Sequence, residues 1–236
     1  MIIAANFKTN HTRESTANYL EALNLFLDAY PTHCDVRVYP AASSLLRADL
    51  YPHVKLGAQN FYPAVNGAYT GETGAQQLDE FGIKNVLTGH SERRIILKET
   101  QDFIAKKYAF ARSNNWEIIY CIGEPKDVRD NGFKAVAEYL WAEFDGIDTD
   151  YEKLSVAYEP IWAIGTGISA QTEEIAEVLD MLKAELKSVP LLYGGSVNAE
   201  NLRQIVSLKS CGGALIGNAA LDAANFCKLI QIAQNK

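Results

Sequence analysis

Cysteine and histidine are scarce in this sequence of 236 residues, and neither is spaced for a disulfide framework or a metal site. No two cysteines form a CxxC pair, so we expect free buried thiols in a reducing compartment. The four are Cys34, Cys121, Cys211 and Cys227. Three of the four histidines fall in predicted loops without ligand spacing: His11, His33 and His53. The sequence therefore predicts no metal.

Long apolar runs and an excess of positive charge are also missing. No run approaches the ~20 residues of a membrane span, and residues 1–6 are too short and uncharged for a signal peptide. The formal net charge of −7 argues against a general nucleic-acid surface, because such a surface requires clustered Lys and Arg. These absences predict a cytoplasmic protein with no membrane and no nucleic-acid partner. They leave room for one small basic pocket that binds a small anion.

No linker or low-complexity tract divides the chain, and short apolar runs alternate eight times with amphipathic segments. The runs are mostly apolar on both faces, which is typical of parallel strands covered on both sides. They lie at residues 2–7, 36–39, 55–58, 85–88, 117–121, 154–158, 190–193 and 214–216. Eight βα units over residues 1–236 predict an α/β fold, a single-domain (β/α)8 barrel. A doubly wound open sheet is the alternative, but its usual Gly-rich first turn is replaced here by Asn6-Phe7-Lys8.

Helical periodicity is clearest in residues 133–144 and 175–186, where apolar side chains recur three and four residues apart. Each segment predicts a helix with one apolar face that packs on the sheet. The second and third helices have the weakest patterns, and we expect them near residues 43–49 and 74–81.

The carboxyl ends of the predicted strands carry the polar residues that suit chemistry, and in a barrel these ends build the site. Asn6 and Lys8 follow the first strand, the run GHSERR at 89–94 follows the fourth, and Glu159 follows the sixth. The seventh and eighth strands end in Gly194-Gly195-Ser196 and Gly217-Asn218. Backbone N–H groups of these two glycine-rich ends can converge on an anion, and this position is a frequent phosphate site in barrels.

Residues 157–167, with the sequence AYEPIWAIGTG, continue from the sixth strand into a segment that suits neither a helix nor a strand. Pro160 stiffens its start, its middle is apolar, and its end is rich in glycine. We therefore predict a loop that covers a cavity, with Glu159 beneath it and water excluded from proton transfer. Taken singly, Glu159 could instead be a solvated carboxylate, His90 a hydrogen-bonded core histidine, and Lys8 a surface lysine.

Four motifs together resemble the triosephosphate isomerase family: Asn6-x-Lys8, GHSERR at 89–94, AYEPIWAIGTG at 157–167 and YGGSV at 193–197. They occur in the family's order from the first strand to the last, so the resemblance covers the whole chain. The two long motifs are highly specific, whereas the two short ones would be weak alone. The resemblance implies interconversion of dihydroxyacetone phosphate and D-glyceraldehyde 3-phosphate through an enediol(ate), in glycolysis and gluconeogenesis, with no cofactor.

The resemblance also implies roles for individual residues. Glu159 moves the proton, His90 stabilises the charge on the carbonyl oxygen, Lys8 supplies a fixed positive charge, and Asn6 donates a hydrogen bond near the carbonyl. Four residues would bind the phosphate through backbone N–H groups: Gly165, Ser196, Gly217 and Asn218. Ser91 and Glu92 would support the site from behind, with Glu92 paired with a neighbouring base.

Two positions depart from the family pattern. Asn218 stands where the family usually has a glycine, and Ile168 stands where it usually has a lysine. Neither change removes a catalytic group, because Asn218 keeps its backbone N–H and asparagine tolerates a positive φ better than most residues. We therefore expect these departures to affect only the fit of the phosphate and the kinetics of the loop.

Residues 61–74 form a long connection with three aromatic residues and few charges, where ~4–6 residues are the norm. The resemblance implies that this loop inserts beside Asn6 and Lys8 of a second subunit, with Thr70 at the contact, so that the protein is a homodimer. A loop folded on its own barrel is the alternative. Two other functions also remain open, namely an aldolase with Lys8 as Schiff-base nucleophile and a catalytically silent binding barrel.

Overall fold

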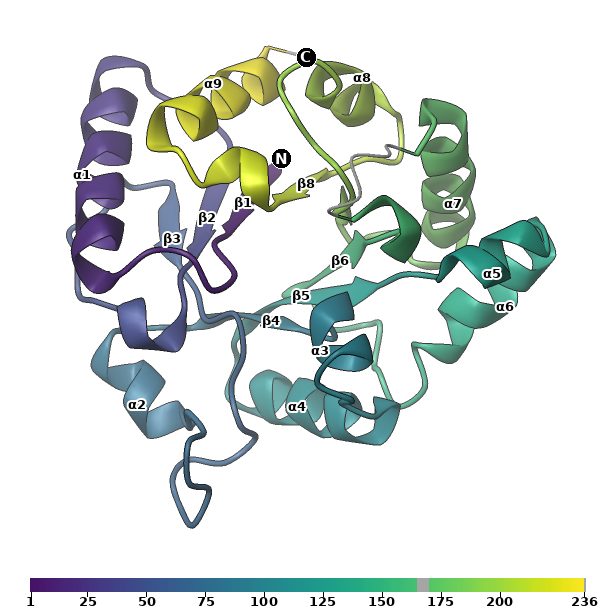
Figure 1. Ribbon diagram of the computed structural model, residues 1–236, viewed down its shortest axis with the longest axis horizontal. Coiled ribbons are helices and arrows are strands. Elements are labelled where there is room, and N and C mark those ends of the chain that lie inside the picture. The colour runs from purple at the N-terminus through teal and green to yellow at the C-terminus, as the bar shows by residue number, and fades with distance from the viewer. Residues whose placement is uncertain (165–169, 236) are drawn as a thin grey trace.

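The computed structural model describes residues 1–164 and 170–235, which form a ring of helices around a parallel barrel (Figure 1). The strands are β1 (Ile2–Asn6), β2 (Asp35–Tyr39), β3 (Val54–Leu56), β4 (Asn85–Thr88), β5 (Glu117–Ile122), β6 (Leu154–Tyr158), β7 (Leu191–Tyr193) and β8 (Gly213–Ile216). All eight predicted strands are therefore confirmed, with bounds that differ by no more than two residues.

The strands pair in parallel in the order β3-β2-β1-β8-β7-β6-β5-β4. The two edge strands meet just beyond the end of β3, where Ala58 forms a parallel bridge with Val86 of β4. Two backbone hydrogen bonds of 2.9 Å support this bridge, from Ala58 N to Asn85 O and from Leu87 N to Ala58 O. The sheet is thus joined into a barrel, as predicted, and the open doubly wound sheet is wrong.

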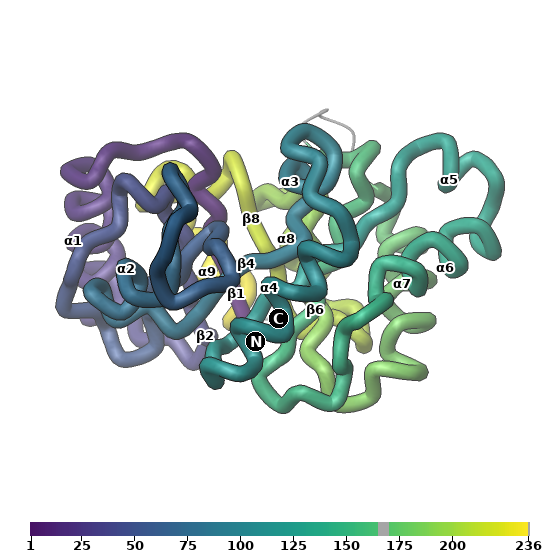
Figure 2. The backbone as a smooth tube through the Cα atoms, turned by 90° about the horizontal axis from the view of Figure 1, so that it is seen from below, coloured from purple at the N-terminus to yellow at the C-terminus, as the bar shows by residue number. Residues whose placement is uncertain are grey.

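Helices connect successive strands everywhere except between β2 and β3, and they cover the outside of the barrel. They are α1 (Arg13–Ala29), α2 (Ala75–Glu80), α3 (Ser91–Ile95), α4 (Gln101–Ser113), α5 (Lys126–Asp130), α6 (Phe133–Ala142), α7 (Thr172–Glu185), α8 (Leu202–Ser207) and α9 (Ala223–Gln234). In the side view, α3 lies at one rim, where β4 ends, and the N-terminus lies toward the opposite rim (Figure 2). Among the described residues, no helix has the length and apolar character needed to cross a membrane.

Two apolar layers account for the apolar character of both strand faces. One layer lies between the strands and the helices and includes the buried faces of α1, α7 and α9. The other fills the barrel itself and consists of Ile2, Ala4, Tyr39, Leu87, Ile119, Cys121, Ala157, Leu192 and Leu215. All four cysteines are buried thiols that are not joined in disulfides.

The helix predicted at residues 43–49 is wrong. The structure has only a 3-10 turn, Ala42–Ser44, after which Leu45 is extended. The side chain of Asn24 on α1 holds the chain at the end of this segment, because its amide donates to Asp49 O at 2.7 Å and accepts from Tyr51 N at 2.9 Å. These bonds satisfy two backbone groups of the non-helical chain between the 3-10 turn and β3. The other weak helix, predicted at residues 74–81, is confirmed as α2.

Candidate active site

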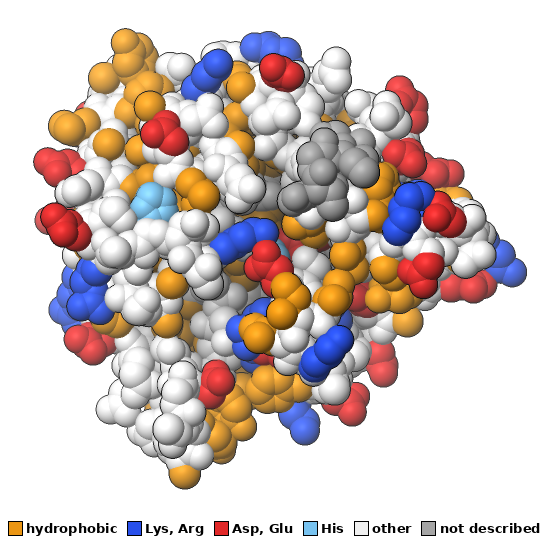
Figure 3. All heavy atoms as spheres, in the orientation of Figure 1, with side chains coloured by type: hydrophobic (Ala, Val, Ile, Leu, Met, Phe, Trp, Pro, Cys, Tyr) orange, Lys and Arg blue, Asp and Glu red, His pale blue; other side chains and the backbone are white. Residues whose placement is uncertain are grey.

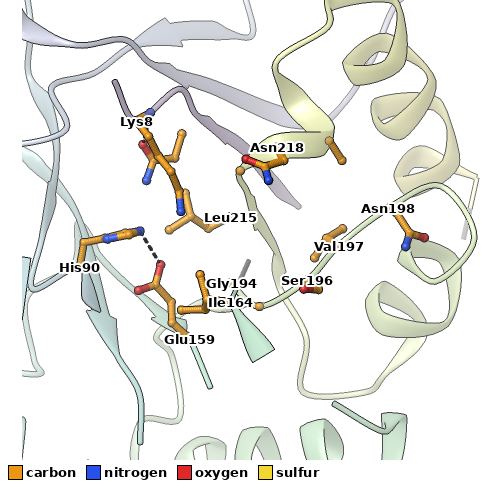
Figure 4. A pocket seen from close by; sticks show the side chains of 14 residues that line it. Lys8, His90, Glu159, Ile164, Gly194, Ser196, Val197, Asn198, Leu215 and Asn218 are labelled. Carbon is orange, nitrogen blue, oxygen red and sulfur yellow. Dashed lines mark hydrogen bonds and ion pairs between the residues drawn. The ribbon is translucent and has the colours of Figure 1, made fainter. Parts of the chain in front are cut away.

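A cavity of about 330 Å³ opens at the carboxyl ends of the strands and gathers most of the residues predicted for the site (Figure 4). It is lined by Asn6, Lys8, His90, Glu159, Ile164, Gly194, Gly195, Ser196, Val197, Asn198, Leu215, Gly217, Asn218 and Ala219. These residues come from the ends of β1, β4, β6, β7 and β8, and from the segments that follow them. The barrel therefore brings together groups that lie up to 213 positions apart in the chain.

Glu159 and His90 face each other across this cavity. Glu159 Oε1 lies 3.3 Å from His90 Nε2, and the two side chains are only 2% and 7% exposed. The second carboxylate oxygen accepts a hydrogen bond of 3.2 Å from the backbone N–H of Ser91. Glycine at position 194 is required here, because a Cβ on Gly194 would lie 2.7 Å from Glu159 Cγ. The carboxylate is therefore buried and held in a fixed orientation at the wall of the cavity.

The hydrogen bonds of His90 define the form of its imidazole ring. Nδ1 accepts a bond of 3.2 Å from the backbone N–H of Glu92, at the start of α3. A nitrogen that accepts a hydrogen bond carries no proton, so the other nitrogen, Nε2, carries the hydrogen. His90 is thus a neutral ring that points an N–H donor toward Glu159 and into the cavity.

Lys8 places a cation at the mouth of the cavity. Its ammonium lies 2.6 Å from Glu92 Oε1, so Lys8 is the base with which Glu92 pairs. The backbone of Lys8 has a φ of +53°, and its N–H donates to Asn6 Oδ1 at 3.0 Å. Because this bond occupies the amide oxygen of Asn6, the amide nitrogen of Asn6 remains available as a donor. The turn after β1 therefore positions a cation and an amide together.

The opposite side of the cavity is formed by the ends of β7 and β8. The hydroxyl of Ser196 donates to Ala163 O at 2.6 Å, which leaves the backbone N–H of Ser196 as its group for an anion. A Cβ on Gly217 would lie 3.4 Å from Lys8 Cε, so this backbone lies beside the lysine. Asn218 also lines the cavity but is not among the residues with positive φ, so tolerance of positive φ is not what permits asparagine there.

The structure describes only the first part of the loop that we predict to cover the cavity, up to Ile164. Residues Ile161–Ala163 form a 3-10 turn, and the indole N–H of Trp162 donates to Glu124 Oε1 at 3.0 Å. Gly165, which was predicted to bind phosphate, and Ile168 lie outside the described residues. Thr70 lies in an exposed stretch of the 61–74 connection and is not among the residues that line the cavity of the single chain.

Two buried ionisable residues next to the site were missed by sequence reasoning. Arg94 and Glu143 do not line the cavity, yet they contact the backbone beside both His90 and Glu159. Arg94 belongs to the GHSERR motif, which was a usable signal. Glu143 has no such signal, because it lies at the end of α6 and resembles a surface glutamate in sequence. Among the described residues there is no cluster of three or more His, Cys, Asp or Glu that could bind a metal.

The fold and the site define a class of protein. An eight-stranded parallel barrel with a buried carboxylate–imidazole pair and a lysine at the carboxyl ends of its strands is a (β/α)8-barrel enzyme with an acid–base site.

The comparisons with known proteins specify the family within that class. The family model for triosephosphate isomerase matches residues 1–233. A triosephosphate isomerase of Nitratiruptor sp. is 50% identical over 234 residues, covering 99% of both chains. Triosephosphate isomerases of Wolinella succinogenes and Campylobacter jejuni subsp. doylei are each 51% identical, over 98% of this chain and 99% and 100% of theirs. The chain belongs to the triosephosphate isomerase family and is an isomerase.

Proposed function

We propose that the chain interconverts dihydroxyacetone phosphate and D-glyceraldehyde 3-phosphate, with Glu159 moving a proton between two adjacent carbon atoms. The observation that carries this proposal is the buried pair in which Glu159 Oε1 lies 3.3 Å from His90 Nε2. A base is needed to take the carbon-bound proton, and a donor is needed at the carbonyl oxygen. No electrons leave the substrate, so the reaction needs no cofactor.

His90 serves as the donor in this scheme. Its Nε2–H, fixed by the bond from Glu92 N to Nδ1, points toward the position of the substrate oxygen. As the carbon-bound proton moves to Glu159, negative charge develops on that oxygen and the N–H stabilises it. Lys8 adds a positive charge at the mouth, and the amide nitrogen of Asn6 donates a second hydrogen bond. The enediol(ate) is then protonated by Glu159 on the neighbouring carbon.

The phosphate of the substrate would bind on the β7–β8 side of the cavity. The backbone N–H groups of Ser196, Gly217 and Asn218 are the donors in this scheme, together with that of Gly165. Support comes from the position of Gly217 beside the Lys8 side chain, since a dianion gains from a cation and several backbone donors at one place. This arrangement matches the preference of barrel enzymes for phosphate at the last two strand ends.

An aldolase that uses Lys8 as a Schiff-base nucleophile is less well supported. Such a lysine must be neutral to attack a carbonyl carbon, and a hydrophobic pocket or a second cation normally favours that form. Lys8 instead lies 2.6 Å from a carboxylate, Glu92, and its side chain is 23% exposed at a cavity lined by several polar side chains. A silent binding barrel is disfavoured by the buried and oriented Glu159–His90 pair.

The decisive experiment is an isomerase assay of the purified chain. Dihydroxyacetone phosphate production from D-glyceraldehyde 3-phosphate is followed by coupling it to a dehydrogenase. We expect turnover with no added metal and with no cofactor other than the nicotinamide nucleotide that the coupling dehydrogenase consumes. No turnover by the folded chain would overturn the proposed function.

We also propose that the enzyme works in the cytoplasm, because its four buried thiols are typical of a protein from a reducing compartment.

We further propose that the enzyme is a homodimer in which the 61–74 connection contacts a second subunit. This connection forms a hairpin, tied by the bond from Tyr62 N to Thr73 O and by Tyr62 and Tyr69 rings whose centroids are 4.0 Å apart. Its side chains Val65 and Tyr69 are 56% and 44% exposed, which favours burial against another surface. Thr70, beside them, would contact the partner subunit near its Asn6 and Lys8.

The face around α3 supplies a matching apolar surface. Ile95, Ile96 and Leu97 are all exposed, and hydrophobic side chains gather over α3 in the space-filling view (Figure 3). Sedimentation of the wild-type chain, and of a variant with residues 64–69 replaced by a short polar turn, tests the proposal. We expect a dimer for the first and a monomer with reduced turnover for the second. A wild-type monomer with full activity at nanomolar concentration would refute the dimer.

A further inference from the structure

A buried ion pair lies behind the wall of the cavity. Arg94 Nε is 3.4 Å from Glu143 Oε1, and the two side chains are 12% and 9% exposed. Neither residue lines the cavity, so neither touches a molecule bound there. Burying two charges is costly unless each also makes good hydrogen bonds. Both residues make such bonds to backbone groups beside the site.

Arg94 contacts the backbone on the His90 side of the site. Its Nε donates to Gly89 O at 2.7 Å, and Gly89 is the residue directly before His90. Its Nη2 donates to Cys121 O at 3.2 Å, near the end of the neighbouring strand β5. The approach is close, because a Cβ on Gly89 would lie 2.9 Å from that guanidinium nitrogen. Arg94 thus ties the end of β4 to the end of β5.

Glu143 contacts the backbone on the Glu159 side. Its Oε2 accepts a bond of 2.8 Å from the N–H of Gly123. The preceding residue, Ile122, accepts the backbone N–H of Glu159 at 2.7 Å. Gly123 itself touches Glu159, since a Cβ on Gly123 would lie 1.8 Å from Glu159 O. A carboxylate at the end of α6 therefore determines where the backbone beside Glu159 can lie.

We propose that Glu143 and Arg94 form a clamp that sets the distance between His90 and Glu159 and so positions them for proton transfer. Both are positioning residues that act through Gly89 and Gly123. The inference rests on the proposed function, because its readout is the turnover of that reaction. Misplacing a reacting group by 1 Å can cost ~10²-fold in rate, so a modest loosening of the clamp has a measurable effect on kcat.

The charge state of Glu143 gives this clamp a pH dependence. Burial raises the pKa of Glu143 to about 7, although the Arg94 charge and the Gly123 N–H both oppose the rise. The other ionisable groups that face it are Glu159, Glu124, Tyr120, Tyr139 and Cys121. The attraction between Glu143 and Arg94 is therefore complete only well above pH 7, and it weakens as the pH falls through that value.

The contribution of Glu143 to stability has the opposite pH dependence. The pKa in the folded chain is raised above the ordinary value of 4.5. Stability from this group is therefore fully present below pH ~4.5 and is lost as the pH rises through ~7. If Glu143 only affected stability, the free energy of unfolding would change with pH but kcat would not depend on its charge. Measuring both kcat and the free energy of unfolding against pH therefore separates positioning from stability.

The test compares Glu143→Gln with Glu138→Gln, a control on the same helix whose side chain is 70% exposed. Glutamine keeps the shape and an acceptor for Gly123 N–H but loses the charge. For Glu143→Gln at pH 8.5 we expect kcat to fall about tenfold, with unchanged KM and unchanged Kd for inorganic phosphate. At pH 6, where wild-type Glu143 is mostly protonated, the kcat of Glu143→Gln should approach that of the wild type. The control should match the wild type throughout.

A kcat for Glu143→Gln within twofold of the wild type from pH 6 to 9 would overturn the clamp, while leaving the isomerase function intact. Inactive wild-type protein would instead overturn the function itself. If Glu143→Gln fails to fold, Arg94→Lys gives a second test. Lysine keeps the cation but cannot reach both Gly89 O and Cys121 O. We expect a lower kcat with unchanged KM, and a wild-type kcat in the folded variant would also refute the proposal.

Discussion

At the amino end of the barrel, Arg37 lies 5% exposed between two carboxylates, with Nη2 at 2.6 Å from Asp35 Oδ2 and 2.7 Å from Glu117 Oε2. Lys55 adds a second contact to Glu117 at 2.8 Å. At the carboxyl end, Lys8 contacts a single carboxylate, and its side chain is 23% exposed and faces the cavity. Both ends thus pair a basic side chain with carboxylates. At the amino end the basic side chain is enclosed between two carboxylates, and at the carboxyl end it has one carboxylate and faces the cavity.

The difference separates structural charges from reactive ones. Burial by itself raises the pKa of Asp35, but the hydrogen bond and charge of Arg37, with Lys55, lower it below its usual value. These charges satisfy one another across β2, β3 and β5. Glu159, His90 and Lys8 are oriented by neighbours yet keep atoms directed into the cavity. Charged groups at one end pair with one another, and charged groups at the other end line the cavity.

Replacing the cation at the carboxyl end should have the larger effect on activity. We expect Lys8→Met to lower kcat/KM by roughly 10³-fold, since it removes a preorganised charge from the developing negative charge and the phosphate. Both kcat and the affinity for inorganic phosphate should fall, with little change in the free energy of unfolding. Lys106→Met, at an exposed position on α4, is the control. Normal steady-state kinetics in Lys8→Met would mean that the phosphate is neutralised elsewhere.

Replacing the cation at the amino end should give the reverse pattern. Arg37→Met leaves Asp35 and Glu117 without their shared partner, so we expect a loss of about 3 kcal/mol in the free energy of unfolding. The folded fraction should keep kcat within about twofold of the wild type. Urea unfolding and steady-state kinetics are measured on this variant and on Arg203→Met, which is exposed on α8. A tenfold fall in kcat without loss of stability would remove the contrast between the two ends.

The smallest expected effect concerns Asn218. Asn218→Ala keeps the backbone N–H, and the side chain that it removes is exposed to solvent. A solvent-exposed hydrogen bond contributes little, so the inhibition constant for inorganic phosphate should change by no more than about threefold. A change above tenfold would show that the side chain, and not the backbone, contacts the phosphate.

The strands and the residues of the site could be predicted because their signals are local. Strands buried on both faces are continuous apolar runs, and Glu159, His90 and Lys8 follow such runs directly. The chain that follows the 3-10 turn, where we predicted a helix, is held instead by Asn24, which is distant in sequence and bonds the backbone at Asp49 and Tyr51. The pairing of Glu143 with Arg94 likewise arises only when the end of α6 meets the segment that follows β4 in the folded chain. Local patterns contain no information about such contacts.

The most direct test of the account is the turnover of Glu159→Gln. Glutamine keeps the size and the hydrogen bonding of the side chain but cannot take a proton from carbon. We predict that kcat falls by ~10²–10⁴-fold or more, while inorganic phosphate binds as it does to the wild type and the free energy of unfolding is unchanged. Near-normal isomerisation by this variant would contradict the assignment of Glu159 as the base.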